Sequence, residues 1–280
     1  MTESTPASDV PLYLSGDKAG LREFLDKFDV FLFDCDGVLW SGDHCFPGTV
    51  ETLELLRNNG KQVVFVTNNS TKSRADYCKK LEGLGIPSTV EEVFSSSYSS
   101  SIYISRILQL PANKRKVYVI GETGIEQELR SENVPFIGGT DPAYRRDVKP
   151  EDYKLIAAGD ESILRPRSRR RPRRSGFPPQ LPQAGPCVPL RQAWRREPTA
   201  LGKPAQAMMD AIEGKFKFDR SRACMVGDRA NTDIRFGREG KLGGTLGVLT
   251  GVSSKEDFES GPVRPHAYLD KLSDLLGSGL

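Results

Sequence analysis

The 280-residue sequence lacks the features that mark several common classes of protein. No apolar run approaches the roughly 20 residues that a membrane-spanning helix needs, so we expect no membrane association. The first residues have neither the basic start and apolar stretch of a secretory signal nor the arginines of a transit peptide. This predicts a cytoplasmic protein, with trimming of an organellar precursor left open. No repeat recurs at a fixed period, which excludes a solenoid or a propeller.

The cysteines are few, odd in number and without a Cys-x-x-Cys pair. Disulfide frameworks use even sets of cysteines, and structural zinc sites use closely spaced pairs. We therefore expect five free thiols in a reducing compartment: Cys35, Cys45, Cys78, Cys187 and Cys224.

Residues 161–198 lack lysine and show neither helix nor strand periodicity. They hold ten arginines, eight prolines and two glutamates, a composition that predicts local disorder. Three explanations stay open: an arginine-rich nucleic-acid arm, a natural linker insertion, or a stretch translated in the wrong reading frame. We favour the third, because abundant arginine and proline without lysine indicate misread GC-rich codons. Few aromatics and a position inside a domain argue against a nucleic-acid partner.

Outside that stretch, short apolar runs alternate with helix-like stretches. We expect strands at residues 30–33, 61–66, 117–120, 155–158, 223–226 and 245–249. We expect helices at residues 49–57, 73–84, 97–108, 125–131, 204–213 and 232–239. This alternation predicts an α/β fold with a parallel sheet covered on both faces. Ligands of such sheets bind beyond the carboxyl ends of the strands, where we look for a site.

Two carboxylates follow the first of these strands directly, at Asp34 and Asp36. Gly37 permits a turn that lets both face a metal ion. A surface turn and a fragment of a calcium loop are the alternatives. A calcium loop is disfavoured because Cys45 stands at the twelfth position, where that loop has glutamate.

Polar side chains also end the second strand, where Thr67 and Asn68 could donate hydrogen bonds to phosphate oxygens. Their neighbours Ser70, Thr71 or Ser73 could instead cap the next helix. Both roles are compatible.

Two further pieces lie far downstream. Lys203 precedes Pro204, which we expect to open a helix, although an isolated lysine is ordinarily a solvated surface charge. Asp228 and Asp233 follow the strand at 223–226, and Asp233 could simply favour a helix N-terminus.

Together these pieces describe one reaction. A phosphate dianion repels a carboxylate nucleophile, so attack needs a cation, and Mg²⁺ suits a site with one or two carboxylates such as Asp34 and Asp228. Thr67, Asn68 and Lys203 would offset charge on the phosphoryl oxygens. Asp36 remains for proton transfer.

The order of these four motifs resembles that of the haloacid dehalogenase (HAD) superfamily. The longer strings at residues 33–40, 66–70 and 227–234 resemble its phosphoglycolate phosphatase, 4-nitrophenylphosphatase and pyridoxal phosphatase branch. The resemblance covers about residues 20–160 and 197–280. It implies a Rossmann-like core at residues 20–110 and 200–280, after a tail at 1–19. It also implies an inserted α/β cap of the C2 type at residues 111–199, whose second half is atypical because it includes 161–198.

The resemblance also implies roles for the site residues. Asp34 would attack phosphorus and form an aspartyl phosphate, while Asp36 would protonate the leaving alcohol and then activate water. Mg²⁺ would be held by Asp34, the main-chain carbonyl of Asp36 and Asp228, with Asp233 behind them. Asn231 departs from the branch, which often has an acid there.

The expected substrate is a small phosphorylated metabolite, with 2-phosphoglycolate first and pyridoxal phosphate as the alternative. The cap would choose between them, and the branch implies pairing of two copies through the cap. An alternative from another functional class is that the chain is a non-catalytic or nucleic-acid-binding variant that uses residues 161–198.

Overall fold

The computed structural model describes residues 10–109, 111, 116–144 and 199–280. Their contacts form two compact units, the first from residues 10–67, 74–96 and 201–280 and the second from the other described residues. The contacts place a boundary between Ser96 and Ser97, earlier in the chain than the expected one after residue 110. The expected strand at 155–158, the second half of the cap, the disorder of 161–198 and Cys187 lie outside the described residues.

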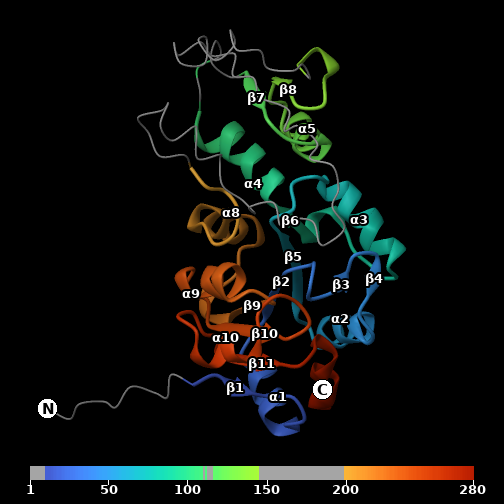
Figure 1. Cartoon of the computed structure of the whole chain (residues 1–280), viewed down its shortest axis with the longest axis vertical. Coiled ribbons are helices and arrows are strands. Elements are labelled where there is room, and N and C mark those ends of the chain that lie inside the picture. Colours follow the sequence, from blue (N-terminus) through green and yellow to red (C-terminus); the bar gives the residue numbers. More distant parts are fainter. Residues whose placement is uncertain (1–9, 110, 112–115, 145–198) are drawn as a thin grey trace, which may run out of the picture. The chain divides into compact units, whose positions relative to one another are not determined.

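The first unit is built on a parallel sheet of seven strands (Figure 1). In spatial order they are β1 (Leu12–Tyr13), β11 (Ala267–Leu269), β10 (Gly244–Val248), β9 (Ala223–Gly227), β2 (Val30–Phe33), β5 (Gln62–Thr67) and β6 (Val93–Ser95). The α/β fold with a parallel sheet is confirmed. Strands β1, β6 and β11 were not expected from the sequence. Each has only two or three residues, too few to show a pattern.

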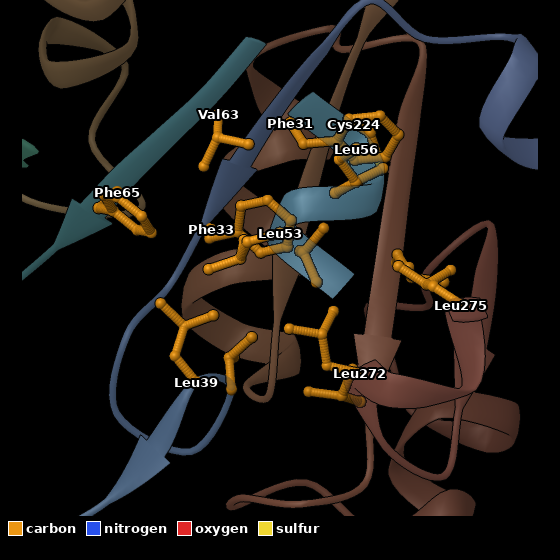
Figure 2. Packing of buried hydrophobic residues seen from close by; sticks show 14 of the residues in the cluster. Phe31, Phe33, Leu39, Leu53, Leu56, Val63, Phe65, Cys224, Leu272 and Leu275 are labelled. Atoms are coloured by element: carbon orange, nitrogen blue, oxygen red, sulfur yellow. The ribbon is translucent and has the colours of Figure 1, made fainter. Parts of the chain in front are cut away.

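Strands β2 and β9 are apolar throughout because helices cover both faces of the sheet. On one face, Phe31 and Phe33 pack with Leu53 and Leu56 of α2 (Thr49–Asn58) and with Leu272 (Figure 2). Helix α1 (Lys18–Asp26) also contributes residues to this cluster, and Leu272 begins the 3₁₀ segment η7 (Leu272–Ser278).

On the opposite face, Gly237 of α9 (Arg235–Glu239) lies so close to Met225 of β9 that a Cβ atom there would come within 3.0 Å of it. Strand residues alternate between the two faces, so a doubly covered strand reads as a continuous apolar run.

Two of the remaining helices of the first unit lie close to their expected positions: α3 (Arg74–Gly83) and α8 (Gln206–Phe216). Helix α10 (Lys255–Ser260) was not expected from the sequence. The expectation that Pro204 opens a helix is wrong. The Ala205 N–H donates to the carbonyl of Gly202 at 2.8 Å, which closes a turn, and the helix begins only at Gln206. The expected helix at 232–239 begins as the π-helical turn η6 (Ala230–Ile234).

The second unit contains a short βαβ arrangement of β7 (Val117–Val119), α5 (Thr123–Ser131) and β8 (Phe136–Gly138), with the strands parallel. Val119, Leu129 and Val134 form its small buried cluster. The expected helix at 97–108 is α4 (Ser96–Ile102), continued by the π-helical turn η2 (Tyr103–Ile107). Across the described ranges of both units, no helix has the length and apolar character to cross a bilayer.

Candidate active site

The end of β2 places Asp34 at the carboxyl edge of the sheet. Its N–H donates to the carbonyl of Val226 at 2.9 Å, which continues the pairing of β2 with β9 by one residue. Because β5 lies on the other side of β2, Thr67 and Asp228 end neighbouring strands at the same edge. The register of three strands therefore gathers residues that are remote in sequence.

Lys203 connects two of the carboxylates. Its Nζ lies 2.8 Å from Oδ1 of Asp34 and 2.8 Å from Oδ1 of Asp233, and it donates to the carbonyl of Val66 at 2.8 Å. Only 2% of the lysine side chain is exposed, so the reading of Lys203 as a solvated surface charge is wrong. Burial alone would lower the pKa of Lys203, but Asp233 and Asp34 outweigh this effect and raise it.

Asp228 lies at the end of β9 and is buried. Its Oδ2 accepts the Val252 N–H at 2.7 Å, whereas its buried Oδ1 has no hydrogen-bond partner within the described part of the chain. Burial, and then the charge of Asp34, raise the pKa of Asp228. A buried carboxylate oxygen without a partner is costly, and it indicates a place for a cation.

Glycines make room for this carboxylate. Gly37 has φ of +89°, and a Cβ atom there would lie 2.7 Å from Oδ2 of Asp228. A Cβ atom on Gly251 would overlap the same carboxylate. The loop after β10, which holds Gly251 and Val252, was missed in the sequence. Its only signal was a glycine beyond a strand end.

Asp233 lies behind the other two carboxylates on η6. Its Oδ2 accepts the Arg229 N–H at 3.1 Å, and Gly227 leaves space for its Cβ. Burial, and then Asp34, raise the pKa of Asp233, which Lys203 opposes. Asn231, on the same turn, is exposed.

Oxygen atoms of Asp34, Asp228 and Asp233 all lie within 4.8 Å of one another. Asp34 and Asp233 share the ammonium of Lys203, and the guanidinium of Arg229 comes within 4.0 Å of Asp228, so three carboxylates face two cations and the cluster has an excess of negative charge. Hard oxygen donors of this kind suit Mg²⁺, and the unpartnered Oδ1 of Asp228 fits the same reading. The residues present therefore fit a magnesium site.

Asp36 differs from the other acids because 53% of its side chain is exposed. Its Oδ1 accepts the indole N–H of Trp40 at 2.7 Å, and the Nζ of Lys80 lies 3.9 Å from the same oxygen. Trp40 begins the short strand β3 (Trp40–Ser41), which pairs with β4 (His44–Cys45). An exposed carboxyl next to a buried cluster is suited to proton exchange with a substrate.

The hydroxyl of Thr67 is buried and lies 3.3 Å from the hydroxyl of Tyr77. Asn68 is grouped with the second unit. The roles of Thr67 and Asn68 toward phosphate stay predictions.

Comparison with known proteins agrees with this arrangement. Residues 31–135 match the family described as haloacid dehalogenase-like hydrolase, and residues 200–275 match one described as HAD-hydrolase-like. The 4-nitrophenylphosphatase of Schizosaccharomyces pombe is 45% identical over 91% of this chain and 95% of that protein. Phosphoglycolate phosphatase 1A, chloroplastic, of Arabidopsis thaliana is 38% identical over 91% of this chain and 78% of that protein.

A solved structure is also similar. The glycerol phosphate phosphatase Rv1692 of Mycobacterium tuberculosis, in complex with magnesium, superposes with a TM-score of 0.67 and 27% identity, over 90% of this chain and 77% of that one. With the carboxylate cluster at the edge of a parallel sheet, these likenesses are decisive: the chain belongs to the haloacid dehalogenase-like hydrolases, among the members that are phosphatases.

Proposed function

We propose that this protein hydrolyses a small phosphate monoester with Mg²⁺ through an aspartyl phosphate on Asp34. The observation that carries the proposal is Lys203, buried between Asp34 and Asp233 at 2.8 Å from each. A buried cation at this distance offsets the charge of the Asp34 carboxylate and holds it in place, and a carboxylate oxygen is the group that attacks phosphorus. The exposed Asp36 is the acid and base of the reaction.

The first step forms the bond between a carboxylate oxygen of Asp34 and phosphorus. The bond to the ester oxygen breaks, its electron pair stays on that oxygen, and Asp36 gives it a proton, so a neutral alcohol leaves. In the second step Asp36 removes a proton from water, which attacks phosphorus. Phosphate then leaves and the Asp34 carboxylate is restored.

The chain's own residues also bind and orient the phosphoryl group. Lys203 offsets negative charge at Asp34, and Thr67 and Asn68 are the proposed donors to the phosphoryl oxygens. Asp34, Asp228 and the carbonyl of Asp36 would hold Mg²⁺, with Asp233 orienting Lys203. When bound, the ion neutralises charge between nucleophile and phosphate.

Among esters, we propose 2-phosphoglycolate as the substrate. The support is a set of relatives named phosphoglycolate phosphatase at 34–38% identity. Glycerol 3-phosphate is the competitor because other relatives, at 32% identity, are named for it. Pairing of two copies and a cytoplasmic location stay predictions, and the nucleic-acid alternative rests on residues 161–198, outside the described ranges.

The test is phosphate release from 4-nitrophenyl phosphate, 2-phosphoglycolate, glycerol 3-phosphate and pyridoxal phosphate, with Mg²⁺ and with a chelator. Asp34→Asn should reduce every rate to background because an amide is a poor nucleophile. Asp210→Asn is the matched control, since Asp210 is an exposed acid paired with Arg220. Turnover by Asp34→Asn, or full activity in chelator, would refute the mechanism. Preference for another ester would correct only the substrate.

A further inference from the structure

The contacts around Asp36 single out one of its two oxygens. The indole N–H of Trp40 and the ammonium of Lys80 both approach Oδ1, at 2.7 and 3.9 Å. Oδ2 has no hydrogen-bond partner in the described ranges of the chain. A carboxyl that is held by one oxygen keeps the other free in a fixed direction.

Trp40 is itself firmly placed, because its side chain is fully buried although its indole N–H needs an acceptor. Asp36 supplies that acceptor. The main chain closes the same turn, since the Gly37 N–H donates to the carbonyl of Trp40 at 2.8 Å. The indole is therefore a rigid support, and its single donor is directed at Asp36.

Lys80 approaches from helix α3. Its Nζ lies 4.6 Å from the centre of the Trp40 ring, so the ammonium contacts both the ring face and the Asp36 carboxylate. A cation over an indole face is favourable, and 21% exposure of the side chain means partial shielding from water. The three side chains form one contact group.

We infer that Trp40 and Lys80 are positioning residues for proton transfer: they fix Oδ1 of Asp36, so that Oδ2 meets the leaving oxygen of the ester. The inference rests on the proposed function, in which Asp36 is the acid. Neither residue touches the reacting atoms in this account, because each acts through Asp36.

The test uses two esters that differ in their need for a proton. An alcohol leaves poorly as an alkoxide, whereas 4-nitrophenolate is a stable anion near neutral pH. A misplaced acid should therefore slow glycerol 3-phosphate or 2-phosphoglycolate much more than 4-nitrophenyl phosphate. The quantity to compare is kcat/KM, since it reports the step in which the leaving group departs.

The variants are made in the full chain. Asp36→Asn calibrates the effect and should lower kcat/KM for the alkyl ester by about 100-fold or more, with a smaller loss for the nitrophenyl ester. Trp40→Phe keeps an aromatic ring but removes the N–H, and Lys80→Met keeps an unbranched side chain but removes the charge. Each should show the same selectivity at about 10-fold. Lys80→Arg should restore most of the lost rate. Lys79→Met, at an exposed position of the same helix, should change neither ester.

The outcomes distinguish a failure of the positioning roles from a failure of the proposed function. If Asp36→Asn is selective while Trp40→Phe and Lys80→Met slow both esters equally or not at all, the positioning roles are refuted and the proposed function stands. If Asp36→Asn slows both esters equally, or Asp34→Asn retains activity, the proposed function fails and the positioning roles fail with it. Selective loss in all three variants supports the inference.

Discussion

The Nζ of Lys203 lies 2.8 Å from Oδ1 of Asp34, and this contact joins a residue of the last third of the chain to the first long strand. Both side chains are largely withdrawn from water, with 2% and 14% of their surfaces exposed. The contact therefore contributes to folding as well as to the chemistry of Asp34.

Replacing Lys203 tests both contributions. Lys203→Met should abolish phosphatase activity and lower the free energy of unfolding by about 3–5 kcal/mol, because it leaves buried carboxylates without their cation. Urea unfolding at neutral pH, without Mg²⁺, measures the stability. Lys217→Met, at an exposed position, is the control. Unchanged stability of Lys203→Met would contradict the buried ion pair.

Magnesium should stabilise the folded protein independently of turnover. At an ion concentration about 100 times Kd, the expected gain in unfolding free energy is about 2.7 kcal/mol. Asp228→Asn should remove most of this gain because its Oδ1 is the unpartnered buried oxygen, whereas Asp210→Asn should retain it. Thermal unfolding with and without Mg²⁺ reads out the effect. An equal gain in Asp228→Asn would place the ion elsewhere.

The narrow space beside Asp228 should make activity sensitive to a larger side chain at Gly251. In Gly251→Ala the new methyl group would overlap the Asp228 carboxylate, and the displaced ligand should cost about 100-fold in kcat. Gly214→Ala is the matched control, because no atom lies within 4 Å of the place that its methyl group would take in α8, and it should gain about 0.5–1 kcal/mol of stability. The measurement is kcat of both variants with 4-nitrophenyl phosphate. Normal activity of Gly251→Ala would show that the loop moves to accept the methyl group and would contradict this prediction.

A pH effect on stability should come from His266, far from the carboxylates in the sheet order. Its Nδ1 accepts from the Thr245 N–H at 3.0 Å, and burial, then Arg238, lower its pKa from 6.5 to about 4. Between pH 6.5 and 4 the unfolded chain binds a proton that the folded chain does not. Stability should therefore fall with decreasing pH in this window, by up to about 1.4 kcal/mol per unit.

The control for this effect is a pair of asparagine variants. His266→Asn retains an acceptor but cannot titrate, so it should remove this part of the pH dependence, whereas His44→Asn, at an exposed position, should leave it. Unfolding free energies at pH 4.5, 5.5 and 6.5 provide the comparison. Identical slopes in His266→Asn and the parent would contradict the assignment.

The sequence was most informative where a strand is buried on both faces. The apolar runs at β2, β5, β9 and β10 are long enough to be recognised as strands. Asp34 and Asp228, which follow β2 and β9, are expected at one edge because the carboxyl ends of parallel strands meet there. The position of Lys203 could be suggested only by the order of the motifs, because its burial arises from a turn that brings it to β5.

Other parts of the site carry no local signal. Lys79 and Lys80 are adjacent lysines on one helix, and only the packing of α3 beside the turn at Trp40 distinguishes them. The Val252 N–H that donates to Asp228 belongs to a loop whose side chains give no indication of a site. Main-chain donors and contacts between distant elements depend on the folded structure, so a pattern of residue types could not reveal them.

The strand order has a consequence for synthesis on the ribosome. Strand β2, which leads into Asp34, gains its neighbour β5 early, whereas its other neighbour β9 is translated about 160 residues after β5. A nascent chain therefore has the nucleophile long before it has Lys203 or Asp228. We expect catalytic competence to arise only once the C-terminal strands have joined the sheet, so fragments that end before β9 should be inert.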